Sequence, residues 1–87
     1  MSTHRSNYRP GVAVGMITLA APIPSQLEEN GLQAMLEELP GVRAVEFPRQ
    51  DGIEVKYDAG LVGERQLSGA VRLAGYVLLE FAPQAVK

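Results

Sequence analysis

The sequence predicts a single α+β domain in which strands and helices follow one another in the order βαββαβ. Alternation of apolar and polar residues marks the strands, and apolar residues at positions i, i+3, i+4 and i+7 mark the two helices. The chain has 87 residues, which is enough for one modest hydrophobic core and too few for two. Its 46% hydrophobic and 21% charged residues are typical of a folded globular protein.

The first strand is predicted at residues 12–19, where both alternating sets of side chains are apolar. Two-sided apolarity of this kind is typical of a central strand, covered on both sides by its neighbours. The stretch APIPSQLEEN follows, and its prolines, Pro22 and Pro24, interrupt regular strand pairing. We therefore expect a stiff loop between the first strand and the first helix.

The first helix is predicted from Ser25 to Leu39. Ser25, with Glu28 three residues later, fits a capping box, in which the serine oxygen accepts from the third helical N–H and the glutamate returns to the cap's own N–H. Pro40-Gly41 stops the helix. One apolar face is expected to carry Leu32, Met35, Leu36 and Leu39.

The second half of the chain predicts a hairpin, a helix and a last strand. Residues 45–47 and 53–57 alternate around the turn residues PRQDG, as in a hairpin. A second helix ends at Gly75, a glycine in the position of a C-cap. The last strand is YVLLEFAP, with Pro83 as its end. On one side of it we expect Val77, Leu79 and Phe81.

The organisation is one domain between two short ends. Residues 1–10 are predicted to form a flexible arm, residues 11–83 the domain and residues 84–87 a tail. Two right-handed split β-α-β units in this order make a four-stranded antiparallel sheet with both helices on one face, the ferredoxin-like arrangement.

Composition excludes several classes of function. A net charge of −2 gives no broad basic field, so we expect no nucleic-acid binding. No cysteine is present, which excludes disulfides and thiolate metal sites. The longest apolar run, residues 12–24, is shorter than a membrane span of about 20 residues and holds two prolines, so no membrane insertion is predicted. The start lacks the apolar segment of a signal peptide, and a cytoplasmic protein is expected.

Two segments carry a family resemblance. GLQAMLEELPGVRAVEF, residues 31–47, resembles the heavy-metal-associated domain of copper chaperones and of the amino-terminal modules of metal-pumping ATPases. VKYDAGLVGERQLSGAVRLAGY, residues 55–76, resembles the second signature of that family, with its Tyr-Asp turn and its Ala-Gly-Tyr end. The resemblance covers about residues 12–82, and it implies the ferredoxin-like fold.

The resemblance also places the metal motif of the family, Gly-Met-Thr-Cys-x-x-Cys, over residues 22–28, so that Ser25 and Glu28 occupy the two cysteine positions. A hydroxyl and a single carboxylate are hard, weak ligands that do not replace a thiolate pair, and we expect them to cap the helix instead. No metal ligand is assigned, and no cofactor is predicted. The other candidate ligands form no pair, because Met1 and His4 lie in the arm and we expect Met16 and Met35 in the core.

The predicted function is a non-catalytic protein-binding or adaptor module, derived from a metal-trafficking chaperone that has lost its thiolate site. In chaperones of this family the loop and the Ala-Gly-Tyr corner meet the partner, which is here a protein, with a metal-pumping ATPase as one candidate, or a second copy of the chain. The prolines could equally shape a tight connection only, and Tyr76 could simply pack at the strand start. The predicted docking residues are Pro22, Ile23, Pro24, Ser25, Gln26 and Tyr76.

Other functions are alternatives. A metal-transport accessory could bind metal weakly through ligands other than cysteine, and a regulatory domain of the same topology could hold a small ligand at a strand–helix junction. No glycine-rich phosphate loop supports the latter. A hydrolase of the acylphosphatase type would need an arginine after the first strand, and APIPSQ contains none. An RNA-binding sheet would need stacking aromatics on its central strands, where residues 53–57 offer only Tyr57.

Overall fold

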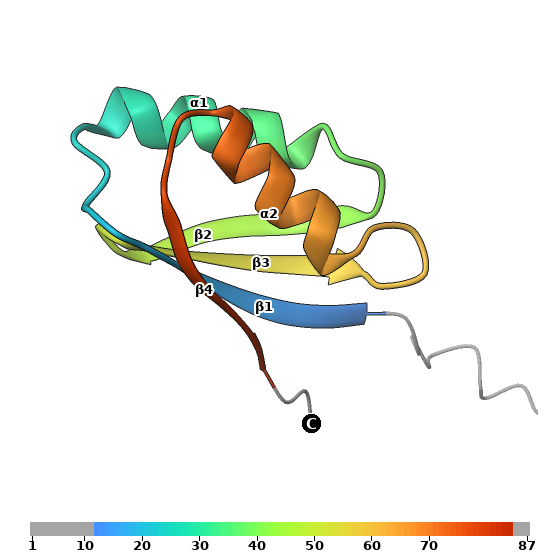
Figure 1. Ribbon diagram of the computed structural model, residues 1–87. Helices are drawn as coiled ribbons and strands as arrows, with labels where there is room; N and C mark the ends of the chain where they lie inside the picture. Colours follow the sequence, from blue (N-terminus) through green and yellow to red (C-terminus); the bar gives the residue numbers. More distant parts are fainter. Residues whose placement is uncertain (1–11, 85–87) are drawn as a thin grey trace, which may run out of the picture.

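The computed structural model describes residues 12–84, in which four strands and two helices follow the predicted order (Figure 1). The predicted arm and most of the predicted tail lie outside the described residues. The elements are β1 (Val12–Leu19), α1 (Gln26–Glu37), β2 (Val42–Arg49), β3 (Gly52–Asp58), α2 (Glu64–Leu73) and β4 (Leu78–Gln84).

The four strands form one antiparallel sheet in the order β2-β3-β1-β4. Both helices cover the same face of this sheet, with α1 packed toward β2 and α2 toward β4 (Figure 1). The ferredoxin-like fold predicted from the sequence is confirmed. It leaves β2 and β4 at the two edges of the sheet and puts β1, the most apolar strand, at its centre.

The core lies between the helices and the covered face of the sheet. Ile17, Ile53 and Val55 of the central strands have no exposed surface, and neither have Leu36, Leu67 and Val71 of the helices. Burial of one such side chain contributes about 1.5–3 kcal/mol. On the helix faces, the predicted period holds, because Met35, Leu39 and Ala70 pack against the same core while Leu32 is buried in it.

Helix α1 begins where the sequence predicts and ends earlier. Ser25 is its N-cap, with extended backbone angles, and Glu38 is its C-cap, so Leu39 lies beyond the helix rather than in its last turn. Leu39 nevertheless packs against the core. The chain then reverses at Gly41, whose φ of +96° is a backbone conformation that disfavours any residue with a side chain.

Strands β2 and β3 are longer than the predicted hairpin strands, and the turn between them is shorter. The turn consists of Gln50 and Asp51, whereas the sequence predicted turn residues from Pro48 to Gly52. Pro48 lies in β2 at an irregularity in the register with β3, between Glu46 and Arg49, and an edge strand tolerates a residue without an N–H at such a place.

Strand β4 corrects two predictions. The register with β1 shifts at Leu79, so that Leu19 pairs with Leu78 and Thr18 with Glu80. This bulge breaks the alternation that put Val77, Leu79 and Phe81 on one side: Phe81 packs against the core, whereas Val77 and Leu79 are 68% and 66% exposed. The strand also continues through Pro83 to Gln84, again because it is an edge strand.

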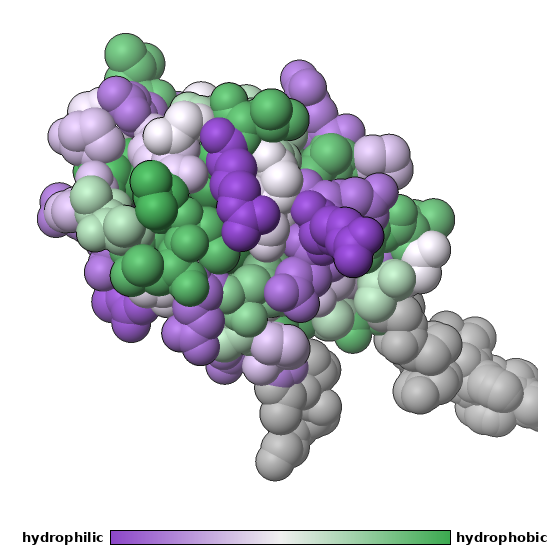
Figure 2. Space-filling view, in the orientation of Figure 1, coloured by the Kyte–Doolittle hydropathy of each residue, from purple (hydrophilic) through white to green (hydrophobic). Residues whose placement is uncertain are grey.

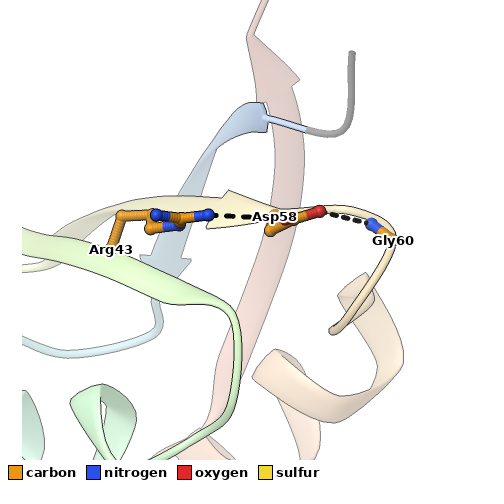
Figure 3. A network of polar contacts seen from close by, with 3 residues as sticks. All are labelled: Arg43, Asp58 and Gly60. Atoms are coloured by element: carbon orange, nitrogen blue, oxygen red, sulfur yellow. Dashed lines mark hydrogen bonds and ion pairs between the residues drawn. The ribbon is translucent and has the colours of Figure 1, made fainter. Parts of the chain in front are cut away.

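A polar network closes the connection between β3 and α2 (Figure 3). The Asp58 carboxylate accepts a hydrogen bond of 2.9 Å from the Gly60 N–H and faces the Arg43 guanidinium of β2 at 3.5 Å. The Asp58 N–H donates to the Gly41 carbonyl at 2.7 Å. One aspartate therefore joins a turn, the neighbouring strand and the end of the α1–β2 connection.

Candidate functional site

The loop between β1 and α1, residues 20–25, is held from both flanks. On one side the Leu19 and Ile23 N–H groups donate to the Asp51 and Gln50 carbonyls of the β2–β3 turn, at 2.8 and 2.7 Å. On the other side the Ala20 N–H donates to the Val77 carbonyl, just before β4, at 2.9 Å. The loop is therefore fixed to two segments that are distant in sequence, beyond the stiffness that its prolines give.

Ile23 was predicted as a docking residue, but it does not lie on the surface of this loop. Its side chain is 3% exposed and belongs to the hydrophobic core. Pro22 and Pro24 on either side are exposed, as are Ser25 and Gln26. Burial of the apolar Ile23 side chain in the core is favourable and holds the loop against the domain, whereas the two prolines remain on the surface of the loop.

Ser25 caps α1, but the predicted capping box is only half formed. The Ser25 Oγ accepts a hydrogen bond from the Glu28 N–H at 3.2 Å. The reciprocal bond from the Ser25 N–H to the Glu28 carboxylate is not among the hydrogen bonds of residues 12–84. Ser25 is thus confirmed as the N-cap, and the expected role of the Glu28 side chain is wrong.

The Glu28 carboxylate instead accepts a hydrogen bond from the Tyr76 hydroxyl at 2.5 Å. This bond joins the first turn of α1 to the connection between α2 and β4. It also raises the pKa of Tyr76 to about 12, because the carboxylate holds the phenolic proton, the ring is partly desolvated and the charge of Glu28 opposes a phenolate. Sequence reasoning missed this pair, since two residues 48 positions apart show no local signal.

Ser25, Glu28 and Tyr76 therefore form one polar cluster at the corner over which the family resemblance places the metal motif. Ser25 and Glu28, the residues at the implied cysteine positions, both bond to groups of the chain itself. Between residues 12 and 84, no three His, Cys, Asp or Glu side chains gather as metal ligands commonly do. The cluster stabilises two connections against each other, with a net contribution of about 0.5–1.5 kcal/mol for a typical hydrogen bond.

The methionines are apart from each other. Met35 packs against the core, as predicted. Met16 lies on the opposite face of the sheet, paired with Glu54 and Ala82, so its predicted place in the core is wrong. Met1 and His4 lie outside the described residues. The prediction that the methionines form no ligand pair stands for Met16 and Met35, which are separated by the sheet.

Two shallow cavities flank the Tyr76–Glu28 bond. One, of about 280 Å³, lies between the loop and the start of β4 and is lined by Pro22, Pro24 and Val77. The other, of about 210 Å³, lies between α1 and the end of α2 and is lined by Met35 and Ala74. Glu28 and Tyr76 line both cavities and separate them.

Exposed apolar residues surround this corner. Val77 and Leu27 are 68% and 79% exposed. The sequence predicted Val77 only as a strand residue, and Leu27 was not singled out. Figure 2 shows apolar surface gathered over the α2–β4 connection and the start of β4. The bulge in β4 explains Val77 and Leu79 in part, because the shift in register turns these residues away from the core.

The chain has the ferredoxin-like fold, and several solved structures share this fold. The chain is similar to a copper-binding domain from HMA7, a P-type ATPase, with a TM-score of 0.74 and 19% identity over 84% of this chain and 99% of that one. It is similar to the N-terminal domain, in its Cu(I)-loaded state, of a potential copper-translocating P-type ATPase from Bacillus subtilis, with a TM-score of 0.71 and 18% identity over 86% and 94%.

A third similar structure is oxidized MerP from Ralstonia metallidurans, with a TM-score of 0.67 and 16% identity over 78% of this chain and 94% of that one. The sequence matches no family model, and no curated protein matches it significantly. At these identities the likeness concerns the fold: the chain has the fold of the heavy-metal-associated domains that its sequence resembles. No helix between residues 12 and 84 is long and apolar enough to cross a membrane.

Proposed function

We propose that this chain is a non-catalytic adaptor module that keeps the fold of a metal-trafficking domain, has lost its thiolate metal site, and binds a protein partner through the former metal corner. The observation that supports this most directly is the cluster of Ser25, Glu28 and Tyr76. The residues that stand at the implied cysteine positions fix the loop and the Tyr76 corner in place, which is a structural role rather than a ligand's role.

The chemistry of the donor set supports the loss of the metal site. Cu(I) prefers soft thiolate and thioether ligands, and the corner offers a hydroxyl and one carboxylate that already accepts a hydrogen bond. A hard oxygen site for Ca²⁺ would need six to eight oxygen ligands, far more than these residues provide. Ser25 Oγ and Glu28 Oε1 each already accept a hydrogen bond from the chain, so a metal at this corner would compete with the Ser25 cap and the Tyr76 bond.

The proposed docking surface consists of Pro22, Pro24, Ser25, Gln26 and Tyr76, with Val77 added and Ile23 removed. Its backbone is fixed by hydrogen bonds on both flanks, so little conformational entropy is lost on binding. Exposed apolar residues beside an aromatic ring and a polar rim are typical of interface centres. Because two similar structures are domains of P-type ATPases, a metal-pumping ATPase is a candidate partner.

The test is a titration of the isotope-labelled chain with a partner identified by pull-down, followed through backbone amide shifts. We expect the shifts to cluster at residues 22–26 and 76–77. The variant Tyr76→Ala should bind about five- to thirtyfold more weakly, which corresponds to 1–2 kcal/mol for an aromatic residue near an interface centre.

The matched control is Arg43→Gln, which changes an exposed residue on β2 away from this corner. It should leave binding unchanged. Shifts that cluster on the uncovered face of the sheet and spare residues 22–26 and Tyr76 would overturn the proposed docking surface. Retention of one equivalent of Cu(I) by the unaltered chain would overturn the loss of the metal site independently.

A further inference from the structure

A second surface lies away from the cluster of Ser25, Glu28 and Tyr76, in the groove between α2 and β4. The groove has a volume of about 570 Å³. Its two walls are the side of α2 that carries Arg65, Ser68 and Arg72, and four successive residues of β4, from Leu78 to Phe81. Figure 2 shows hydrophilic side chains over α2 beside the apolar surface at the start of β4.

Arg65 and Arg72 give this groove a positive wall. They are seven residues apart on α2, which is close to two helical turns, so both point to one side with about 10 Å between them along the axis. Both are exposed, and neither takes part in the ion pairs formed within residues 12–84, which involve Arg43 and Arg49. Their charges are therefore available to a ligand.

Ser68 lies between the two arginines and is buried. Its exposed fraction is 6%, and among residues 12–84 it is the polar residue that is buried. Its hydroxyl forms no hydrogen bond with another residue between 12 and 84. A buried polar group without a partner is rare, and one that lines a groove points to a ligand that supplies the partner.

The acidic residues at the groove do not cancel the arginines. Glu64 also lines the groove, but as the first residue of α2 it lies more than two helical turns from Arg72, so it does not offset the charge at the Arg72 end. Glu80 pairs with Thr18, and cross-strand partners share a face of the sheet. Since the neighbouring pair, Ile17 and Phe81, faces the core, the Glu80 side chain points to the uncovered face of the sheet, away from the arginines of α2.

The wall that β4 contributes is the free edge of the sheet. β4 pairs with β1 on one side and with no other described strand, so the backbone N–H and C=O groups of its outer side are unpaired. Leu79, at the bulge, has no partner in β1 and is 66% exposed. Pro83, which would block strand pairing, lies beyond the four residues that line the groove.

We propose that this groove binds an extended acidic segment of a partner protein, which adds to the edge of β4 as a fifth strand. The backbone of the segment would pair with residues 78–81, and its carboxylates would meet Arg65 and Arg72 on the facing helix. Strand addition supplies affinity through main-chain hydrogen bonds, and the two arginines select for acidic residues. The groove and the proposed docking surface around Tyr76 would then be two separate binding surfaces of the chain.

A second copy of the chain fits this groove less well. A two-fold axis that set α2 antiparallel to its copy would place Arg65 opposite Arg72 of the other copy, because the axis would pass midway between them. Like charges in direct opposition are destabilising. An acidic segment has the complementary charge, and an extended chain matches the open shape of the groove and the free strand edge.

The test uses a short fluorescent peptide that alternates glutamate with valine, titrated against the full chain and followed by anisotropy. We expect saturable binding that weakens as salt is added. In the variant Arg65→Gln with Arg72→Gln, binding should be about three- to tenfold weaker. The matched control, Arg43→Gln with Arg49→Gln, removes the same charge from β2 and should bind as the unaltered chain does.

Amide hydrogen exchange separates strand addition from simple anion binding. Bound peptide should slow exchange at residues 78–81, whereas inorganic phosphate should not. Equal binding by the two double variants, equal binding of a peptide with lysine for glutamate, or full competition by phosphate without protection of β4 would each overturn the proposal. Tyr76→Ala leaves Arg65 and Arg72 in place, so this variant should bind the peptide as the unaltered chain does. A failure of the groove proposal is therefore distinguishable from a failure of the proposed docking surface around Tyr76.

Discussion

The two ends of the helical layer are built in different ways, although both consist of a pair of neighbouring connections. At one end the α1–β2 and β3–α2 connections meet, and Gly41, Asp58 and Gly60 are joined by backbone and carboxylate hydrogen bonds (Figures 1 and 3). At the other end the β1–α1 loop and the α2–β4 connection meet, and the Tyr76–Glu28 side-chain bond joins them.

The comparison of the two ends separates the residues that the fold requires from the residues that binding of a metal ion would require. Pro40-Gly41-Val42 and Tyr57-Asp58, which carry much of the family resemblance, lie at the first end, where each has a backbone or packing role. The second end carries the loop over which the family resemblance places the metal motif, and here its residues are those of a capped connection held by hydrogen bonds. Likeness at the first end is therefore evidence for the fold and not for metal binding.

The largest expected effect is the creation of a thiolate metal site at the second end. In the variant Ser25→Cys with Glu28→Cys, two thiolates would stand at the start of α1, and Cu(I) affinity should rise by orders of magnitude over the unaltered chain. Competition with a Cu(I) chelator measures this, and Ser25→Cys alone is the control. If the unaltered chain already kept one equivalent, ligands such as Met1, His4 and Met16 would have to account for it.

At the first end, Gly41→Ala should destabilise the fold by about 2–4 kcal/mol, the sum of the cost of a positive φ and of a steric clash. The φ is +96°, and an added Cβ would stand 2.8 Å from the Leu61 Cβ. Gly75→Ala is the matched control, since its φ is +100° with nothing within 4 Å, and it should cost only about 1–2 kcal/mol. Urea denaturation measures both, and equal losses would show that the contact with Leu61 is not the cause.

Loss of the cap at the second end should have a smaller effect. Ser25→Ala removes the acceptor of the Glu28 N–H and should lower the free energy of unfolding by about 0.5–2 kcal/mol. Ser25→Asp keeps a capping oxygen and should retain most of the stability. A Ser25→Ala variant as stable as the parent would mean that the hydroxyl does not cap α1, and Ser25 would return as a candidate functional group.

The smallest expected effect is the contribution of the Tyr76–Glu28 hydrogen bond to stability, which is measured through the pH dependence of the unfolding free energy. The pKa of Tyr76 in the folded chain is raised to about 12 from its ordinary value of 10.0, so folding favours the protonated phenol. The stability that this bond contributes is present in full below pH 10 and is lost as the pH rises through about 12. Unfolding free energies of the parent and of Tyr76→Phe should therefore converge over that range.

Phenolate absorbance gives a direct check on the same bond. In Glu28→Gln the charge next to the ring is removed, and the phenol of Tyr76 should titrate closer to its ordinary pKa than it does in the parent. Tyr76→Phe identifies which part of the absorbance change belongs to this residue. An identical titration in the parent and in Glu28→Gln would rule out the bond in solution.

Local patterns predicted most of the fold and part of the site. The element order, the N-cap at Ser25 and the apolar face of α1 follow from the spacing of residues within one segment, and all three are confirmed. Among the wrong predictions, Ile23 as a docking residue, Met16 as a core residue and the alternation in β4 each depend on what lies across the sheet or beneath the loop. Alternation along a strand assigns its side chains to two opposite faces, but it does not show which of these faces the helices cover.

The sequence alone therefore determined which segments become strands and helices, because capping, periodicity and turn chemistry act over a few residues. Tertiary structure decided the partners of the individual side chains. Glu28 meets Tyr76, and Arg65 and Arg72 stand opposite the free edge of β4, because the fold brings distant segments side by side. Hydrogen bonds and charges act only at short range, so the surfaces that such side chains form exist only once the chain has folded.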